Sequence, residues 1–348
     1  MRIEDIITAS DLQGYITARE YPAQVLETLF PPKKDDIVEL AYVKGAAGEP
    51  VSASIRAVDA ETQIGGRSGE GELVRLEIPT IARKIPLTEK FKLELAAAKD
   101  DRAVGVLKRQ IFNDLDNMVQ GVRIRIERMR ADALMNGKIE VNENGLVTEF
   151  DYKVPATHKF VVGTGAQKIA AWNASSNPGD WVKHLEDWVE LLKTDRGITA
   201  TRILTSSQVL RVVLSAAVTK SYLPDVGYIT QAILNDWLAS ANLPTFATYD
   251  EMYAIEGNQA GVTRERYIPE NKIALFGDGA LGDTQYGVTA EEVTYRLDPS
   301  VQMSEHQFII GAIAREFDPP VDWTKAAARA LPSFVKADEV VQAVVLTS

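Results

Sequence analysis

The stretch "GGRSGEGELVRLEIPTIARKIPLTEK", residues 65–90, combines a glycine-rich segment with a strand-like pattern. Four of its first seven residues are glycines: Gly65, Gly66, Gly69 and Gly71. The residues that follow alternate, and one face of the predicted strand carries Val74, Leu76 and Ile78. A phosphate-binding loop would need GxxxxGK and then Ser or Thr, between a strand and a helix. Because a strand follows these glycines and that motif is absent, we predict a structural or interaction loop.

The same stretch supplies the second strand of a predicted ribbon whose first strand is residues 51–58, "VSASIRAV". The connection, residues 59–71, is much longer than an ordinary hairpin loop. An isolated two-stranded ribbon is only marginally stable in water, so its apolar face needs a covering surface. Periodicity does not say which surface this is; our hypothesis is an adjacent copy, in a heterologous contact that can close into a shell. The predicted contact residues are Ile64, Gly65, Gly66, Arg67, Gly69, Gly71, Val74, Leu76 and Ile78.

Residues 100–137 predict one long helix, because apolar residues recur there at spacings of three and four. This apolar stripe consists of Leu107, Ile111, Leu115, Met118, Val122, Ile126, Met129 and Ala133. Gly137 follows the predicted end, where a glycine suits the C-terminal cap. Further helices are expected at 179–194, 207–217 and 227–240, and strands around a turn at 142–145, at 202–205, near 244–256 and at 272–276. The fold class is therefore α+β.

The composition is that of an ordinary soluble protein, with 45% hydrophobic and 25% charged residues. The net charge of −11 argues against a generalist nucleic-acid binder, which would carry a basic surface. The chain has no cysteine, which excludes disulfides, thiol catalysis and thiolate metal sites. The N-terminus lacks the pattern of a secretory signal, and the apolar runs are too short to cross a bilayer. We expect an intracellular, soluble product without membrane contact.

Few residue patterns suggest a catalytic or metal site. The histidines, His158, His184 and His306, are too far apart in the sequence for a helical or hairpin metal pair. Ser206 and Ser207 fit a helix cap better than a nucleophile, since no GxSxG motif is present. We therefore predict no catalytic, cofactor-binding or metal-binding residue and no cofactor.

Two charged clusters receive a structural interpretation. Glu291 and Glu292 are adjacent and do not face each other on one element, so a solvated pair is expected. The arginines of "VRIRIERMR", residues 122–130, lack interleaved aromatic residues, so we expect a charged outer helix face rather than a nucleic-acid site.

Five segments, in the same order, resemble the major capsid proteins of tailed phages, in their lambda-type (major head protein) branch. They are "LFPP", the stretch at 65–90, "RMRADALMNGKIEV", "NKIALFGDGALGDTQYGVTAEE" and "FDPPVDWTKAAARALPSFVKADEVVQAVV". The second is similar to the family's extended loop, and the third to the end of its spine helix. The last two are similar to its late glycine–tyrosine–glycine region and its C-terminal strands.

This resemblance implies the HK-ninety-seven-like capsid fold. The implied bounds are 1–47 for an N-terminal arm, 48–90 for the extended loop, 91–178 and 297–348 for a peripheral domain with a spine helix at about 100–137, and 179–296 for an axial domain. Some relatives crosslink subunits through a lysine in this loop. Lys84 and Lys90 lie at its base, so this chemistry is not carried over.

The resemblance also implies a structural protein that acts without catalysis, the major capsid subunit of a tailed phage or prophage. Its copies would self-assemble as pentamers and hexamers into an icosahedral shell, the viral head, around double-stranded DNA bound without sequence specificity. Because no long charged segment precedes the arm, a separate scaffolding protein is expected, with a portal and, as an optional partner, a decoration protein. The expected location is the virion, after assembly in the bacterial cytoplasm.

Two alternatives remain open on the sequence alone. An encapsulin-type nanocompartment shell protein would have the same fold around an enzyme cargo. A soluble α+β enzyme would need an acid/base site around Glu186, Asp187 or Glu291.

Overall fold

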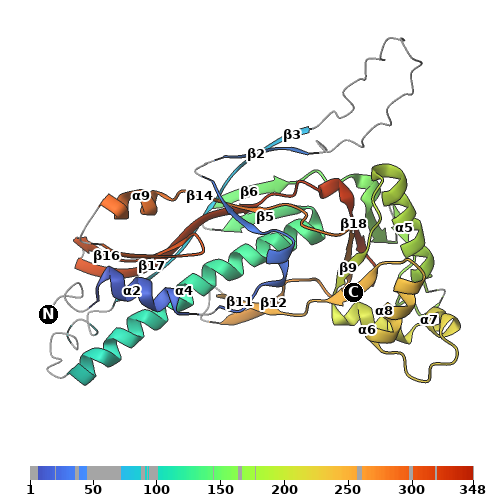
Figure 1. Ribbon diagram of the computed structural model, residues 1–348, viewed down its shortest axis with the longest axis horizontal. Coiled ribbons are helices and arrows are strands. Elements are labelled where there is room, and N and C mark those ends of the chain that lie inside the picture. Colours follow the sequence, from blue (N-terminus) through green and yellow to red (C-terminus); the bar gives the residue numbers. More distant parts are fainter. Residues whose placement is uncertain are drawn as a thin grey trace, which may run out of the picture. The chain divides into compact units, whose positions relative to one another are not determined.

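A computed structural model of the chain describes residues 7–19, 21–35, 39–44, 72–87, 91, 93, 101–143, 145–163, 167–176, 178–256, 261–297, 301–317 and 320–347. The helices and strands are labelled in Figure 1. The chain divides into two compact units. Unit one contains Met1–Leu40, Arg75–Arg130 and Asp283–Ser333, and unit two contains Ala41–Val74, Ala131–Gly282 and Phe334–Ser348. This division into two units does not test the predicted bounds of the arm, the extended loop, the peripheral domain and the axial domain, which remain predictions.

Helix α4, Asp101–Asn136, is the long helix that the apolar stripe predicts (Figure 1). All residues of the stripe are buried, from Leu107 near its start to Ala133 near its end, so the prediction is confirmed. Gly137 follows with a φ of 69°, the left-handed conformation that glycine adopts most readily. The side-chain amide of Gln342 donates a hydrogen bond of 2.7 Å to the carbonyl oxygen of Leu134, which caps the end of the helix.

Unit one is built on a six-stranded sheet in the order β1–β14–β17–β16–β15, with β4 also paired to β17. The strands are β1 (Pro32–Lys34), β4 (Thr80–Leu87), β14 (Thr284–Gly287), β15 (Gln302–His306), β16 (Ile309–Phe317) and β17 (Pro320–Pro332). Strand β17 pairs with β16 along one edge and with β4 along the other, antiparallel in both cases. Strand β14 pairs antiparallel with the C-terminal end of β17, residues 329–332. Strand β1 in turn pairs parallel with β14. Strand β17 is therefore central to the sheet.

Helix α4 shares a hydrophobic core with this sheet. Small side chains on one face of β17, Ala326, Ala328 and Ala330, are buried in the same cluster as the helix stripe. Gly311 on β16 allows a close approach, because a Cβ at this position would lie 2.9 Å from Leu115 Cδ1. Helix α2 (Ala9–Thr17), the 3-10 helix η1 (Val25–Thr28) and helix α9 (Ala290–Leu297) complete the described helices of unit one.

Unit two contains a second six-stranded sheet, in the order β10–β9–β13–β18–β7–β8. Its strands are β7 (Lys159–Val162), β8 (Lys168–Ile169), β9 (Arg202–Thr205), β10 (Thr245–Thr248), β13 (Lys272–Phe276) and β18 (Val340–Val344). Strand β18 lies between β13, to which it is antiparallel, and β7, to which it is parallel. The two middle strands, β13 and β18, consist mostly of buried apolar residues, as expected where helices cover a sheet.

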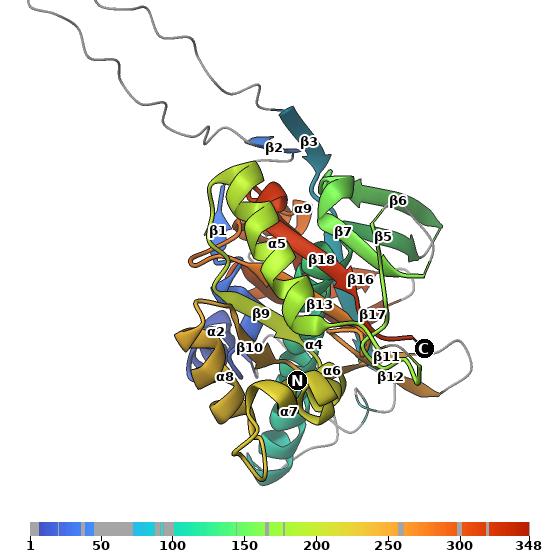
Figure 2. The ribbon, with the colours of Figure 1, turned by 90° about the vertical axis from the view of Figure 1, so that its right-hand side faces the viewer.

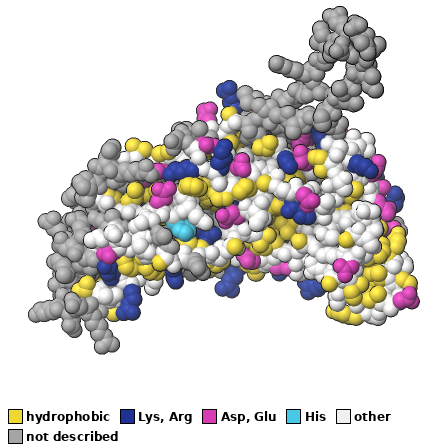
Figure 3. All heavy atoms as spheres, in the orientation of Figure 1, with side chains coloured by type: hydrophobic (Ala, Val, Ile, Leu, Met, Phe, Trp, Pro, Cys, Tyr) yellow, Lys and Arg dark blue, Asp and Glu magenta, His cyan; other side chains and the backbone are white. Residues whose placement is uncertain are grey.

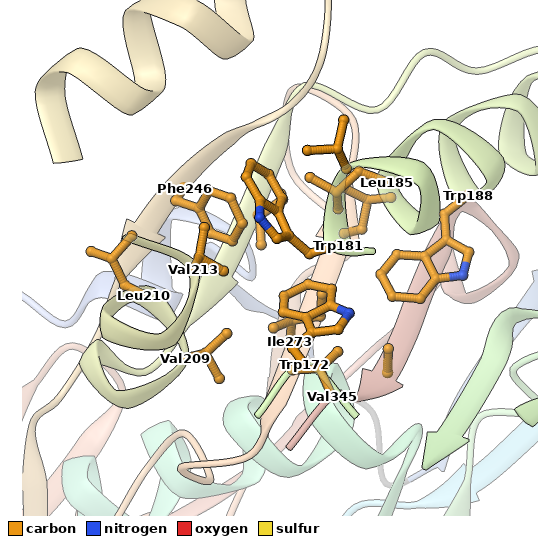
Figure 4. Packing of buried hydrophobic residues seen from close by; sticks show 14 of the residues in the cluster. Trp172, Trp181, Leu185, Trp188, Val209, Leu210, Val213, Phe246, Ile273 and Val345 are labelled. Atoms are coloured by element: carbon orange, nitrogen blue, oxygen red, sulfur yellow. The ribbon is translucent and has the colours of Figure 1, made fainter. Parts of the chain in front are cut away.

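Four helices of unit two pack on this sheet around a tryptophan-rich core: α5 (Trp181–Arg196), α6 (Ser207–Ser215), α7 (Ala217–Tyr222) and α8 (Gln231–Ser240). Figure 2 shows α5 in front of β18 and β9. Trp172, Trp181 and Trp188 converge with Phe246 and the sheet residue Ile273 in this core (Figure 4). The helix predicted at 179–194 is confirmed as α5, whose inner face buries Trp181, Val182, Leu185, Trp188 and Leu192.

Sequence signals at the helix ends and turns also match the structure. Asp180 accepts hydrogen bonds from the backbone at the start of α5, and Gly197 ends it with a φ of 66°. Ser206 Oγ accepts a hydrogen bond from Val209 N, as the cap prediction requires. Three two-stranded sheets complete the described fold: β2 (Glu39–Lys44) with β3 (Glu72–Glu77), β5 (Lys138–Glu143) with β6 (Leu146–Asp151), and β11 (Met252–Glu256) with β12 (Val262–Arg266).

The substitution Gly137→Ala is expected to lower the free energy of unfolding by about 3 kcal/mol. The new side chain would need a φ of 69° and would lie 2.7 Å from Val154 Cγ2. Gly145→Ala is the matched control, because Gly145 has a φ of 80° and no atom within 4 Å of an added Cβ. It should lose about 1–2 kcal/mol, the backbone cost alone. Urea unfolding of both variants measures the difference, and equal losses would contradict the proposed steric cost.

Candidate assembly surfaces

The described part of the predicted extended loop is its base. Strand β3 begins at Glu72, and the glycine-rich residues 64–71 and the first predicted strand, 51–58, lie outside the described residues. The backbone of Val74 lies in β3, and Leu76 is half-buried. Ile78 is fully buried within its own chain. A contact between the Ile78 side chain and another copy is therefore not supported.

The return of this loop is fixed to the sheet of unit one. Strand β4 pairs with β17 from Thr80 to Leu87. Just before it, Arg329 Nε donates to the carbonyl oxygen of Ile78 at 2.9 Å. Lys84 Nζ lies 4.0 Å from the centre of the Trp323 ring, in a cation–π contact. The base of the loop is therefore paired into the sheet, and Lys84 lies in that base, as its position in the sequence indicates.

The N-terminal segment, residues 7–35, packs on helix α4 and the sheet of its own unit. Its apolar side chains Ile7, Leu12, Leu26, Leu29 and Phe30 are all buried. These side chains are buried because α4 and the sheet supply the apolar surface that the arm lacks alone. Residues 32–34 add strand β1 to the sheet, in spite of two prolines at 31 and 32.

Polar contacts fix this arm to α4 at several points along the helix. Near its start, Lys108 Nζ lies 3.0 Å from Asp11 Oδ2. Farther along, Arg19 and Asp116 form an ion pair of 3.0 Å. These contacts hold the arm along the helix over several turns.

A buried cluster on α4 holds the middle of the arm. Glu127 Oε1 accepts a hydrogen bond of 2.9 Å from Leu26 N, and Arg130 Nη1 lies 3.1 Å from Glu127 Oε2. Arg130 Nε donates to Thr284 Oγ1 at 2.8 Å, and Arg123 donates to the carbonyl oxygen of Pro22. Arg130 and Glu127 are 1% and 0% exposed. These two buried charges are tolerated because each has an oppositely charged partner and a neutral hydrogen-bond partner.

This cluster corrects the expectation of a charged outer face at residues 122–130. Arg123, Glu127 and Arg130 are buried against the arm and the sheet. The sequence carries one signal for this: the three residues recur at spacings of four and three, which places them on one helix face. Sequence reasoning could not identify their partners, which lie about a hundred residues away in the arm.

The candidate acid/base residues do not form a catalytic arrangement. Glu186 and Asp187 are exposed on α5, and Asp187 pairs with Lys183. Glu291 Oε1 lies 2.6 Å from Lys325 Nζ in unit one. Burial alone would raise the pKa of Glu291, but the hydrogen bond from Lys325, a backbone hydrogen bond and the charge of Lys325 together outweigh burial and hold this pKa below its ordinary value. Glu292 is buried against Lys34, so the expected solvated pair at 291–292 is wrong.

The three histidines have structural environments. Trp172 Nε1 donates a hydrogen bond of 2.9 Å to His184 Nδ1. His158 is fully buried and its Nε2 lies 3.0 Å from Asp195 Oδ2. His306 packs against Tyr21, with ring centres 4.6 Å apart. Among the described residues, no group of three or more histidine or acidic side chains could hold a metal ion. Within the same residues, no helix has both the length and the apolar character of a membrane span.

Acidification is expected to destabilise the protein before its carboxylates titrate. Burial lowers the pKa of His158, His184 and His306 below the ordinary histidine value. The unfolded chain therefore binds protons at a higher pH than the folded chain does, and stability falls as the pH drops below about 6.5. Urea unfolding between pH 7.5 and pH 5 measures this slope. His158→Gln should flatten it, and an unchanged slope in that variant would contradict the contribution of His158.

Comparisons with known proteins match the chain over nearly its whole length. The family profile described as Phage major capsid protein E matches residues 8–345. Among solved structures, the chain is similar to a prophage protein of E. coli CFT073 described as a capsid protein, with 12% identity, a TM-score of 0.61, and coverage of 97% of this chain and 99% of that one. It is also similar to a phage-related protein of Bordetella bronchiseptica RB50, with 11% identity, a TM-score of 0.54, and coverage of 98% and 99%. No curated protein sequence matches significantly.

Proposed function

The chain belongs to the family of phage major capsid protein E, and on this premise we propose how its copies assemble into a head. It is a major capsid subunit of a phage or prophage, with the α+β, HK-ninety-seven-like capsid fold that its sequence predicts. Its place is the capsid of the virion, as part of a shell. This is a structural role, and neither the enzyme nor the encapsulin alternative is favoured. The observation that carries this conclusion is the family match over residues 8–345.

The proposed shell is icosahedral and built from pentamers and hexamers of the subunit. We propose that the extended loop, residues 48–90, reaches a neighbouring copy, with contact through Ile64, Gly65, Gly66, Arg67, Gly69, Gly71, Val74 and Leu76. Two features support this proposal: β4 anchors one end of the loop in the sheet of its own unit, and β2 pairs with β3 at the other. Because the base of the loop is paired into the sheet, a contact at the tip of the loop would join a neighbouring copy to the folded part of this subunit.

The remaining partners follow from the head that such a shell forms. We propose a separate scaffolding protein, a portal, an optional decoration protein and packaged double-stranded DNA, with assembly in the cytoplasm of a bacterial host. The net charge of −11 fits a container that does not bind its DNA tightly or by sequence. The proposed domain organisation of the subunit is unchanged. It has an arm at 1–47, a peripheral domain at 91–178 and 297–348, and an axial domain at 179–296.

Electron microscopy of the purified chain, produced alone and together with the proposed scaffolding protein, tests the proposal. Closed shells of uniform size with fivefold and sixfold clusters are expected. A protein that stays monomeric under both conditions would overturn the proposed assembly. If the shells contain an enzyme cargo and do not accept DNA through a portal, the proposed contents would be wrong. The proposal that the chain forms a shell would still be supported.

A further inference from the structure

The C-terminal end of helix α4 carries a carboxylate and a carboxamide on one face. Asp132 and Asn136 are four residues apart, so their side chains are neighbours on the helix surface. Asn136 Nδ2 donates a hydrogen bond of 3.2 Å to Asp132 Oδ1. This bond orients the carboxamide, because its nitrogen is held by the carboxylate while its oxygen is directed to a second group. Asn136 is the last residue of the helix, and Gly137 then changes the direction of the chain.

A lysine from the sheet of unit two is that second group. Lys272, the first residue of β13, donates a hydrogen bond from Nζ to Asn136 Oδ1. Ala274 of β13 pairs with Gln342 of β18, so Lys272, two residues before Ala274, points to the same face of the sheet as Gln342. Gln342 holds the end of α4 against this face through its hydrogen bond to the carbonyl oxygen of Leu134. The sheet register and the helix cap therefore bring the amine to the carboxamide.

The surroundings of Lys272 favour its uncharged form. Figure 3 shows lysine and arginine side chains scattered over the surface of the molecule, where water stabilises their charge. Lys272 is instead partly buried, and burial lowers the pKa of its amine below the ordinary lysine value. The charge of Asp132 opposes this shift, and the positive charge of Lys159 adds to it. Lys272 is therefore uncharged more often than an exposed lysine, and only an uncharged amine can attack a carbonyl carbon.

Together the three side chains supply a nucleophile, a carbonyl carbon and a group that carries protons. We propose that Lys272 and Asn136 form an isopeptide bond within one chain, with Asp132 as the acid and base. The uncharged Nζ of Lys272 attacks Cγ of Asn136, and the bond between Cγ and Nδ2 breaks. Asp132 takes the proton that Nζ loses and delivers it to Nδ2, so one molecule of ammonia leaves and the carboxylate is restored. The reaction needs no oxidant and no other reactant.

This bond joins the end of α4 to the sheet of unit two, between positions that are far apart in the sequence. It lies within a single copy and outside the extended loop, so the inference does not depend on the proposed shell. A covalent link of this kind stabilises a fold mainly because it restricts the unfolded chain. The helix and the sheet would then stay joined even when the hydrogen bonds between them are broken.

A second reaction at the same carboxamide has to be distinguished from this one. Asn136 precedes Gly137, and attack by the backbone nitrogen of Gly137 on the carboxamide would give a succinimide and also release ammonia. Gly137 N donates a hydrogen bond of 3.0 Å to the carbonyl oxygen of Ala133, which holds this backbone in the helix end. Only the isopeptide bond requires Lys272, so a change at that position separates the two reactions.

Mass spectrometry of the purified, folded chain tests the proposal directly. We expect the intact mass to be lower than that of the sequence by one molecule of ammonia. After proteolysis, the peptide that contains Asn136 should remain joined to the peptide that contains Lys272. An unaltered chain that keeps its full mass after prolonged incubation at pH 8 would overturn the inference. The same conclusion would follow if the lost ammonia came from a peptide that contains Asn136 alone.

Three variants assign the roles, and circular dichroism checks the fold of each. Lys272→Arg keeps the positive charge but not the nucleophile, so it should keep its full mass and unfold at a lower urea concentration. Asp132→Asn should slow the release of ammonia at least about a hundredfold. Lys138→Arg is the matched control, because Lys138 is an exposed lysine near the same helix end and pairs with Glu140; it should react as the unaltered chain does. Release of ammonia that persists in Lys272→Arg would identify the succinimide and overturn the isopeptide bond.

Discussion

Removal of residues 59–71 is expected to leave a folded subunit that forms no closed shells. The deletion, closed with Asn-Gly so that a tight turn can form, removes the glycine-rich part of the loop but keeps β2, β3 and β4. The sheet of unit one does not include these residues, so its stability should change little. The contact that the loop makes with a neighbouring copy would be lost in every subunit. Because a closed shell repeats this contact many times, its loss should prevent closure of the shell. Sedimentation and electron microscopy measure the yield of shells, and urea unfolding checks the fold.

Point variants on the two faces of β3 refine this test. Val74→Ser with Leu76→Ser removes the apolar face assigned to the neighbour and should reduce assembly at least about tenfold. Arg75→Ala with Glu77→Ala changes the opposite, exposed face and serves as the matched control. Normal shells from the deletion, or equal effects from the two pairs, would contradict the assignment of this face to an intersubunit contact.

Glu127→Ala is expected to be the most destabilising single substitution in unit one, with a loss of about 3–5 kcal/mol. It leaves the buried guanidinium of Arg130 without its carboxylate and leaves Leu26 N without its acceptor. Neither group can reach water, because Arg130 is 1% exposed and Leu26 is fully buried. Urea unfolding measures the loss, and limited proteolysis should cut the arm between residues 7 and 35 much faster in the variant.

Two further variants make the result interpretable. Glu127→Gln keeps an acceptor for Leu26 N but removes the charge, so its loss should be smaller than that of Glu127→Ala. Glu140→Ala removes an exposed carboxylate that pairs with Lys138, and a loss within about 1 kcal/mol is expected. A loss below about 1 kcal/mol for Glu127→Ala would show that the cluster does not hold the arm.

The parts of the fold that the sequence predicts depend on neighbours along the chain. The α4 stripe, the helix at 179–194 and the turn at Gly145 each rest on a local period or a local backbone requirement, and each is confirmed. Gly137 and Gly197 end their helices in the left-handed conformation for the same local reason.

The parts that sequence reasoning missed depend on partners far away in the chain. Residues 122–130 show charges that ordinarily face water, and only the arm and Thr284 make their burial possible. Strand β4 contains Pro86, which argues against a strand in a sheet, yet it pairs with residues 322–329 of β17. For the loop, the sequence predicts a ribbon and its apolar face, but the burial of Ile78 depends on packing that no local pattern contains.

The order in which a ribosome makes these strands limits when the subunit can take its shape. Strand β17, residues 320–332, joins β4, β14 and β16, and β18, residues 340–344, joins β13 to β7. The sheet of unit one therefore lacks its central strand until translation has passed residue 332, which is 332 − 87 = 245 residues after the end of β4. The sheet of unit two lacks β18 until translation has passed residue 344. Pairings this distant in sequence form slowly and only once both partners exist. A chain released before residue 320 would lack both strands, and we expect such fragments to remain incompletely folded and therefore open to proteolysis.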